Sequence, residues 1–522
     1  MPDPASQQAI EAATRLQVAG RVAEAERLCR DILLRDPENA AALRLLGALT
    51  GSNGRSHEAV DLLNRCLAID PNDAAAHTMM GAALQALDRK DEALEHFHRA
   101  VALQPGSAQF HYNLGKAQRD AEQFEASVES FRRALAIEPH LPPALNNLGN
   151  SLRDLGRLEE AVPLYQRALQ IRANHPPTLH NLGLALRGLM RLDEATRCFD
   201  TALAFDPGHH ECRVSRAMLL LLLGDFSRGW REYERRWEIS RAFTKRTYPR
   251  PFWDGLDPEG RTILLHYEQG FGDTNQFVRY APLVRARGAR VILECQPELC
   301  ELFETIPGVD EIVTVGDDVP EFDQYRALMS LPMLFGTTLQ SIPAEVPYLS
   351  ADPARVASWK AMIPADGLRV GLVWAGAAGY ANDRNRSLSL ARLGALGEIP
   401  GVHFVGLQKG AAAVQGANPP PGMKLMDVGE KLHDFADTAA VLENLDLVIT
   451  IDTAAGHLAG ALAKPVWLLI PHSPDWRWLL DREDSPWYPT MRLFRQPRIG
   501  DWDSVLDRVK RELAAVVKKQ SG

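Results

Sequence analysis

The sequence predicts an all-α repeat superhelix in the N-terminal part of the chain and an α/β region with two doubly wound parallel sheets in the C-terminal part. Glycines recur with a period of 34 residues, and a set of prolines keeps the same register. These residues are Gly47, Gly81, Gly115, Gly149, Gly183, Pro37, Pro71, Pro105, Pro139 and Pro207. After residue 260 this period stops, and short apolar runs alternate with helical segments, a pattern typical of parallel sheets flanked by helices.

Length, composition and charge limit the classes of function. The 522 residues leave room for several domains of roughly 150 residues each. Hydrophobic residues make up 46% and charged residues 24% of the chain, as in ordinary globular proteins. The formal net charge of -9 offers no general basic field to a phosphate backbone. We therefore expect no nucleic-acid partner.

Cysteine usage and the N-terminal residues bear on the cellular compartment. The six cysteines include no Cys-x-x-Cys pair and no Cys/His spacing of a zinc site, so we expect free thiols in a reducing compartment. The start, MPDPASQQAIEAA, lacks the basic and apolar regions of a signal peptide. The longest apolar stretch, 217–223, is too short for a membrane helix. We expect a cytoplasmic protein without an integral membrane segment.

Each 34-residue unit is expected to be a helical hairpin. Small residues keep the period where two helices must approach closely, at Ala25, Ala59, Ala93, Ser127, Ala161 and Ala195. Apolar residues between them follow helical spacing, and Asp-Pro pairs mark helix ends. This pattern resembles the tetratricopeptide repeat over roughly residues 5–240. Ala173 in place of a proline and Met190 in place of a turn glycine are local departures.

The resemblance implies a superhelix whose inner surface, lined by the first helix of each unit, binds a peptide. Asparagine recurs at one inner-helix position, and aspartate follows two of these residues seven positions later. The candidate peptide-binding residues are Asn113, Asn147, Asn181, Asp120 and Asp154. Amide groups can bond to the main chain of an extended peptide. The alternative is that the asparagines contact only solvent or the next repeat. A second stripe, Arg119, Arg153 and Arg187, is interpreted as an exposed or inter-repeat face.

The α/β region is expected to carry its ligand groups where strands end. The apolar runs are 262–267, 291–295, 312–315, 370–374, 404–407, 447–451 and 466–470. After the first run, the segment EQGFGD places Asp273 at a helix start, where it could serve chemistry, cap the helix, or do both. After the run 447–451, Asp452 and Thr453 lead into the small residues Ala454, Ala455 and Gly456 and then His457. Amide groups at such a helix start favour a phosphate.

Two further strand ends supply groups for the same anionic ligand. The loop after 370–374 holds Gly376, Arg384 and Arg386, and the run 404–407 precedes Gln408 and Lys409. The segment 433–439 places Asp437 and Thr438 nearby, as ligand contacts or as a helix cap. No segment fits GxxxxGK[ST] or GxGxxG, so P-loop hydrolysis and the usual dinucleotide fingerprint are disfavoured.

The segments GFGDTNQFVRYAP and ITIDTAAGHLAGAL resemble the two-Rossmann, or GT-B, glycosyltransferases, specifically the ADP-heptose:lipopolysaccharide heptosyltransferase-like family, over about residues 260–515. With the repeats, the plan is similar to that of protein O-linked N-acetylglucosamine transferases and bacterial flagellin glycosyltransferases. The resemblance implies that Asp273 is the general base and that residues 452–457 hold the ribose and diphosphate of a nucleotide sugar. The full set of expected donor-binding residues is Gly272, Trp374, Gly376, Asn382, Arg384, Arg386, Gln408, Lys409, Asp437, Thr438, Asp452, Thr453, Ala454, Ala455, Gly456, His457 and Arg477.

The division of the chain follows from this resemblance and from the proline- and glycine-rich stretch before residue 260. The expected parts are a repeat superhelix at 1–226, a capping helix and linker at 227–260, an acceptor-side half at 261–350, a connection at 351–366, a nucleotide-sugar half at 367–515 and a tail at 516–522.

Sugar transfer needs a base for the acceptor hydroxyl and donors for the leaving phosphate, and both are present. No DxD motif follows a strand, since Asp501-Trp502-Asp503 matches only by spacing, so we expect no metal and no cofactor besides the nucleotide-sugar co-substrate. The tryptophans Trp476, Trp478 and Trp487 are interpreted as an aromatic corner that packs the C-terminal helix, although stacking on a base is the alternative. For His457, a donor contact competes with a buried core histidine.

Three functions compete at this point. The first is a transferase that moves a sugar to a Ser or Thr hydroxyl of a protein held by the repeats. The second is a transferase that acts on a glycan or lipid core. The third is a non-catalytic scaffold with a degenerate sugar-nucleotide domain.

Overall fold

The computed structural model describes residues 4–239, 246, 248–377, 379 and 382–521. The chain divides into two compact units, residues 1–206 and 207–522. The first unit is all-helical, and the second contains two parallel sheets. The division lies before the boundary expected at residue 226, because helices α13 (His210–Leu222) and α14 (Phe226–Tyr233) pack with the second unit.

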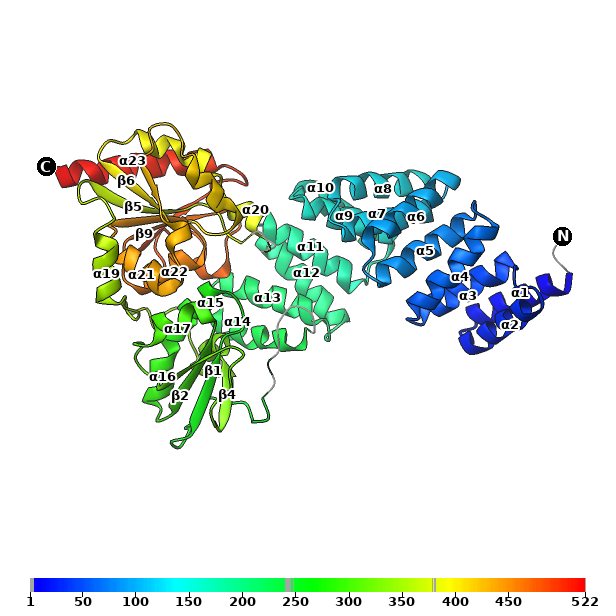
Figure 1. The fold of residues 1–522 in the computed structure, drawn as a ribbon, viewed down its shortest axis with the longest axis horizontal. Coiled ribbons are helices and arrows are strands. Elements are labelled where there is room, and N and C mark those ends of the chain that lie inside the picture. Colours follow the sequence, from blue (N-terminus) through cyan, green and yellow to red (C-terminus); the bar gives the residue numbers. More distant parts are fainter. Residues whose placement is uncertain (1–3, 240–245, 247, 378, 380–381, 522) are drawn as a thin grey trace. The chain divides into compact units, whose positions relative to one another are not determined.

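Unit 1 is a stack of helical hairpins (Figure 1). Helices pair in chain order, with a first and a second helix in each 34-residue repeat. The bounds are α1 Pro4–Val18, α2 Val22–Arg35, α3 Ala40–Ser52, α4 Ser56–Ile69, α5 Ala74–Ala86, α6 Lys90–Leu103, α7 Ala108–Asp120, α8 Phe124–Ile137, α9 Pro142–Asp154, α10 Leu158–Ile171, α11 Pro176–Gly188 and α12 Leu192–Phe205. The predicted hairpins are therefore confirmed.

The turn inside each hairpin uses one residue with a left-handed backbone. This residue keeps the 34-residue period, and its φ lies between 58° and 83° in every repeat and in the α13–α14 turn. The positions are Gly20, Gly54, Asp88, Glu122, Gly156, Met190 and Gly224. Met190 thus occupies the glycine position with φ 58°, as the repeat register predicts. Since left-handed geometry disfavours a side chain, the non-glycine turns carry a local conformational cost.

The repeat glycines allow the two helices of a hairpin to touch. A Cβ atom added to Gly183 would lie 2.5 Å from the ring of Phe199, and one added to Gly149 would lie 2.7 Å from the ring of Tyr165. Gly47, Gly81 and Gly115 meet the large side chain sixteen residues later in the same way. These contacts explain the glycine period that the sequence displays.

Unit 2 begins with a helical hairpin formed by α13 (His210–Leu222) and α14 (Phe226–Tyr233), followed by the 3-10 helix η1 (Glu234–Glu238). Trp230 of α14 contacts the ring of Trp476 edge-on, with centroids 5.1 Å apart, and lies 6.3 Å from Phe277. Trp476, Trp478 and Trp487 are buried. The tryptophans therefore form a packing corner, as expected, but Trp476 packs against α14 rather than the C-terminal helix.

The first sheet has the strand order β3-β2-β1-β4, with all pairs parallel. Its strands are β1 Thr262–His266, β2 Arg290–Cys295, β3 Glu311–Thr314 and β4 Gln324–Ala327. The accompanying helices are α15 Phe271–Phe277, η2 Val278–Tyr280, α16 Ala281–Ala286, α17 Pro297–Phe303, η3 Leu328–Ser330 and α18 Leu331–Leu334.

The second sheet has the order β10-β9-β8-β5-β6-β7 and is also parallel throughout. Its strands are β5 Leu368–Val373, β6 Val402–Gly406, β7 Leu425–Asp427, β8 Leu447–Ile451, β9 Val466–Ile470 and β10 Met491–Arg495. The other elements are α20 Asp383–Arg386, η4 Leu390–Glu398, η5 Ala411–Ala417, η6 Gly429–Lys431, α21 Phe435–Glu443, α22 Ala454–Ala461, η7 Trp476–Trp478 and α23 Trp502–Ser521. Figure 1 shows α23 on one side of this sheet and α21 and α22 on the other.

Two of the expected parts of the chain contain helical residues. The connection at 351–366 contains a helix, α19 (Pro353–Lys360), which begins at the cap Asp352. The tail expected at 516–522 continues α23 as far as Ser521. Strands β4, β7 and β10 were not among the predicted runs.

In both sheets the chain order reverses beside the first strand. β1 lies between β2 and β4, and β5 lies between β6 and β8. Doubly wound sheets bind ligands at such reversals, beyond the carboxyl ends of the strands. The segments after β1, β5 and β8 are therefore the places to examine.

Replacing Gly183 with alanine should destabilise unit 1 by about 1–3 kcal/mol, because the new methyl group overlaps the Phe199 ring. Gly106→Ala is the matched control, since a Cβ atom there meets nothing within 4 Å. Urea unfolding of the full chain followed by circular dichroism measures both. Equal unfolding midpoints for the two variants would contradict the claim that the close contact with Phe199 requires glycine at position 183.

Candidate functional site

The loop after β1 is anchored on η1. Glu268 is buried and pairs with Arg236 through Nε–Oε2 and Nη2–Oε1 contacts of 2.6 and 2.9 Å. Burial raises the pKa of Glu268 even though Arg236 opposes the change. Gln269 donates to the Tyr233 hydroxyl at 2.7 Å. The α14–η1 segment thus fixes the loop that leads to Asp273.

Asp273 is the third residue of α15, within its first turn rather than at its N-cap. Its Oδ2 accepts from the backbone N–H of Gly270 at 3.1 Å, so the carboxylate caps the helix start from inside. Its Oδ1 accepts from Nη2 of Arg477. The side chain is about one-fifth exposed. Helix capping and a chemical role are both compatible with this position.

Arg477 joins groups from the two sheets in one buried cluster. It lies in η7, after β9, and donates to Asp475 Oδ1 at 2.9 Å and to Gln276 Oε1 at 2.6 Å. Its guanidinium also lies over the Trp476 ring, 4.3 Å from the centroid. Burial would lower the pKa of Arg477, but Asp475 and Asp273 together raise it. Arg477, one of the expected donor-binding residues, is therefore bonded to carboxylates in this structure.

Asp452 follows β8 and faces the same cluster. Its Oδ2 accepts from Trp478 Nε1 at 2.9 Å, and its Oδ1 lies 3.7 Å from His457 Nε2. His457 Nδ1 lies 3.0 Å from the Tyr488 hydroxyl, and the ring stacks on Trp478. His457 is buried with neighbours at both ring nitrogens, which agrees with the core alternative.

The loops that carry Asp273 and Asp452 come together at Gly272. A Cβ atom at Gly272 would lie 2.9 Å from His457 Cδ2 and 3.6 Å from the Ala454 Cα. Glycine is thus needed where α15 crosses the start of α22. The two segments named by the sequence are in direct contact within unit 2.

The start of α22 is left without a side-chain cap. Thr453 occupies the N-cap position, but its hydroxyl lies 3.1 Å from that of Thr450 and does not bond the helix. By contrast, α21 has Asp434 at its N-cap position, and the side chain of Asp434 accepts from the Asp437 N–H at 2.7 Å. Free amide groups at a helix start attract anions.

The side chain of Gln408 holds the start of the loop after β5. Gln408 Oε1 accepts from the Trp374 and Ala375 N–H groups at 3.1 and 2.9 Å, and its amide donates back to the Ala375 carbonyl. Lys409 Nζ donates to the Leu432 carbonyl. Trp374 is fully buried in the core of the second sheet. Gln408 therefore supports this loop, and the expected role of Gln408, Lys409 and Trp374 as donor contacts stays a prediction.

The rest of that loop lies closer to Asp452. Gly376 donates to Ser387 Oγ at 2.9 Å, and the Asn382 side chain accepts from Asn385 at 2.6 Å. Arg386 donates to the Asp452 carbonyl at 2.6 Å, while Arg384 is exposed on α20. Ala378, Tyr380 and Ala381 of this loop lie outside the described residues.

Asp437 and Thr438 serve helix α21. Asp437 accepts from Arg355 at 2.8 Å and from the His433 N–H at 3.0 Å, and Thr438 bonds the Asp434 carbonyl at 3.0 Å. The sequence left two alternatives for Asp437 and Thr438, ligand contacts or a helix cap. The contacts in this structure are those of the helix-cap alternative.

The asparagine ladder of unit 1 bonds across repeats. Asn147 Nδ2 donates to the Tyr112 hydroxyl at 3.1 Å, and Asn181 Nδ2 donates to Asn146 Oδ1 at 3.1 Å. Asn113 accepts from Gln109 within its own helix. The inter-repeat alternative thus describes Asn147 and Asn181 in this structure.

The charged residues beside the ladder behave in two ways. Asp154 pairs with Arg119 at 2.9 Å and with Arg153 at 3.4 Å, so this part of the arginine stripe is inter-repeat. Asp120 is exposed and accepts only a long bond of 3.4 Å from Gln85 among the contacts given for described residues.

Sequence reasoning missed Glu268, Arg236, Gln276 and Tyr488. The segment EQGFGD contains Glu268, but nothing in the sequence pairs it with Arg236. Both side-chain atoms of Asn275 and the Nε2 of Gln276 are buried without a partner among the described residues. Unsatisfied buried amides of this kind are uncommon and mark the neighbourhood of Asp273.

The described residues contain no group of three or more His, Cys, Asp or Glu side chains that could hold a metal ion. No helix in the described ranges is long and apolar enough to cross a bilayer.

Comparison with known families identifies the repeats. Family models described as tetratricopeptide repeat match residues 18–83, 78–142 and 141–208. The N-terminal region therefore consists of tetratricopeptide repeats, as its period predicts. Such repeats commonly bind peptides or protein partners.

One curated relative is Protein FlbA of Caulobacter vibrioides (strain ATCC 19089 / CIP 103742 / CB 15), 32% identical over 323 residues. The match covers 57% of this chain and 54% of FlbA, so the chain spans about half the length of that relative.

Several solved structures match part of this chain. MamA is 25% identical, with 31% of this chain and 94% of MamA covered and a TM-score of 0.29. YrrB, described as a TPR protein with an unusual peptide-binding site, is 19% identical, with 36% and 97% covered and a TM-score of 0.32. Pseudomonas aeruginosa PilF is 20% identical, with 41% and 97% covered and a TM-score of 0.38.

The acid stability of unit 2 should depend on Asp452. Burial would raise the pKa of Asp452, but His457, Trp478 and Arg477 together lower it below its ordinary value of 3.8. The folded state therefore gains stability from this carboxylate above pH 3.8 and loses it as the pH falls further. Asp452→Asn should be less stable than the wild type at pH 7, with a smaller loss on acidification.

Urea unfolding at pH 7 and at pH 3 measures this difference. Asp318→Asn, at an exposed loop position, is the control and should follow the wild type. An Asp452→Asn variant that loses as much stability on acidification as the wild type would contradict the assignment.

Proposed function

We propose that the protein is a glycosyltransferase that moves a sugar from a nucleotide sugar to a hydroxyl group of a protein bound by the repeats. The observation that carries the proposal is the buried cluster around Arg477. In this cluster Arg477 donates to Asp273, and its charge helps to lower the pKa of Asp452. The cluster lies beyond the ends of β1 and β8, next to the reversals of strand order in both sheets.

A buried charged cluster is costly to fold, so its presence at a ligand-binding position supports function. Burying an ion pair often stabilises a fold less than apolar packing would. Perturbed ionisable groups in such places are candidates for chemistry. The uncapped start of α22 and the guanidinium of Arg477 together offer N–H donors suited to a diphosphate.

The chemistry follows from these groups. The acceptor oxygen attacks the anomeric carbon of the sugar, the bond from that carbon to the phosphate oxygen breaks, and the hydroxyl proton passes to Asp273. The nucleotide leaves with its new charge met by Arg477 and the amides of Ala454 and Ala455. When a phosphate oxygen replaces Asp273 as the partner of Arg477, the carboxylate is freed to act as the base. The chain's own donors then replace a metal ion.

The repeats supply the acceptor side of the proposal. Asn113 and Asn181 present amides on first helices, and Asp120 is exposed at the end of the same face. An entering peptide backbone would exchange the inter-repeat bond of Asn181, and the bond between Asn113 and Gln109, for bonds to itself. A hydroxyl-bearing Ser or Thr is then the acceptor. A glycan or lipid-core acceptor remains the alternative, since the cluster itself does not select the acceptor.

Asp273→Asn should lower transfer by about 100-fold or more while leaving donor binding in place, because the base is lost and the shape is kept. A thermal-shift panel of ADP, UDP, GDP and CMP sugars first identifies the donor. Turnover of that donor is then measured with radiolabelled sugar. Unchanged turnover in Asp273→Asn would refute the role as base.

Asp437→Asn is the matched control for Asp273→Asn. Asp437 is also the third residue of a helix, and it also binds an arginine and the N–H of a preceding residue. It should lose stability without losing turnover. Equal loss of turnover in both variants would show that the effect is structural.

Replacing Asn113 and Asn181 together with alanine should reduce labelling of protein acceptors while the donor-induced thermal shift stays unchanged. The reason is that the amides serve the acceptor and not the donor. Asn72→Ala, an exposed position outside the ladder, is the control. Labelling that stays at the wild-type level in the double variant would argue for a glycan or lipid acceptor.

One observation favours the scaffold alternative. In this structure Asp273 is already occupied by Arg477, and Gly272 lies against His457. A protein locked in this state would bind no sugar donor. A donor panel without any thermal shift would therefore favour the scaffold function.

A further inference from the structure

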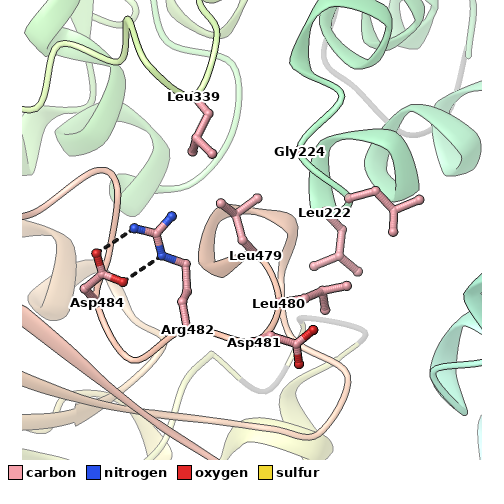
Figure 2. A pocket seen from close by; sticks show the side chains of 9 residues that line it. Leu222, Gly224, Leu339, Leu479, Leu480, Asp481, Arg482 and Asp484 are labelled. Carbon is pink, nitrogen blue, oxygen red and sulfur yellow. Dashed lines mark hydrogen bonds and ion pairs between the residues drawn. The ribbon is translucent and has the colours of Figure 1, made fainter.

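An apolar hollow lies on unit 2, between the end of α13 and the loop that follows η7. Its volume is about 440 Å³, and its floor consists of Leu222, Leu223, Leu339, Leu479 and Leu480. Figure 2 shows leucines from the end of α13 and from the loop after η7 around this space. Leu223 is 47% exposed, so apolar surface is available to a partner.

The rim of the hollow is acidic. Arg482 is paired with Asp484 at 2.6 Å. Asp481 has no ion-pair partner within 4 Å among the described residues, although its charge acts on Arg495 and opposes the lowering of that group's pKa by burial. Leu479 and Asp481 both have left-handed backbones, with φ of 49° and 48°. Such conformations are uncommon outside glycine, and they hold the loop so that Asp481 stands beside the leucines.

The chain itself carries an apolar side chain that suits this hollow. Leu34, at the end of α2, is 82% exposed and is followed by the exposed Arg35, which forms no ion pair among described residues. The later repeats place small or polar residues at the position of Leu34, namely Ala68, Ala102, Ala136, Gln170 and Ala204. A large exposed leucine is therefore a departure of this repeat from its own pattern.

Charge separates Leu34 from the other strongly exposed apolar side chains. Leu256 is 70% exposed but lies between Asp254 and Asp257, which the acidic rim would repel. Val18, which is 84% exposed, and Val414, which is 74% exposed, have no charged neighbour in sequence within two positions. Leu34 combines an apolar side chain with an adjacent cation.

We propose that the hollow of one copy receives Leu34 and Arg35 from a second copy of this chain, with Arg35 against Asp481. The two surfaces differ, so the contact is head-to-tail and leaves one free hollow and one free α2 on every dimer. The protein then associates further as its concentration rises. This association is independent of the proposed transferase activity.

Sedimentation velocity of the full chain across the micromolar range tests the proposal. The wild type should show an average mass that rises with concentration. Leu34→Ser and Leu223→Ser change exposed positions and should each weaken association by roughly tenfold or more. Leu256→Ser is the control and should behave as the wild type.

A mixture of the two variants gives the sharpest result. The Leu223→Ser copy still offers Leu34, and the Leu34→Ser copy still offers the hollow. The mixture should therefore form a heterodimer and stop there. A wild type that stays monomeric, association that survives either substitution, or a mixture that forms no complex would each overturn the proposal.

Discussion

The guanidinium of Arg477 is the group on which the arrangement of the two sheets depends. It comes from the segment after β9, yet two of its partners, Asp273 and Gln276, belong to α15 after β1. A buried cation without these acceptors would be strongly unfavourable, so α15 and η7 must stay together. Arg279 makes a second bond between the two sheet regions, because it lies in η2 and donates to the carbonyl of Trp487, before β10, at 2.7 Å. Both sheets thus present their strand ends to one cluster.

The hairpin α13–α14 contributes to this cluster more than a cap would. Trp230 packs on Trp476, next to Arg477, and Arg236 of η1 holds Glu268 in the loop before Asp273. A displacement of the hairpin would therefore reach both partners of the Asp273–Arg477 pair. This packing also explains why the compact second unit begins at residue 207 rather than after the linker.

Sequence periodicity was sufficient for the repeats because each hairpin is held by local contacts. The glycine period reports a contact sixteen residues away, such as that between Gly183 and Phe199. Buried strands such as β8, with the sequence LVITI, were found because nearly all of their residues are apolar. Strands such as β4, with the sequence QYRA, were missed because their polar side chains interrupt the run.

The candidate site was predictable in position but not in its contacts. Asp452 was found because it directly follows an apolar run, and Asp273 because it ends the short glycine-containing loop after another run. The bond between Arg477 and Asp273 joins residues 204 positions apart, and no local pattern encodes it. Likewise, the amide of Gln408 was expected to bind a ligand, whereas in this structure its oxygen accepts hydrogen bonds from the backbone of Trp374 and Ala375. Such competition between ligand and backbone is decided only by the folded geometry.

Hydrogen–deuterium exchange of the full chain with and without a panel of nucleotide sugars tests the central claim most directly, because it reports where a ligand acts. If the cluster is a donor site, one nucleotide sugar should slow exchange together in Phe271–Phe277, Ala454–Ala461 and Trp476–Trp478. Exchange in these three segments that no nucleotide sugar alters would contradict the account.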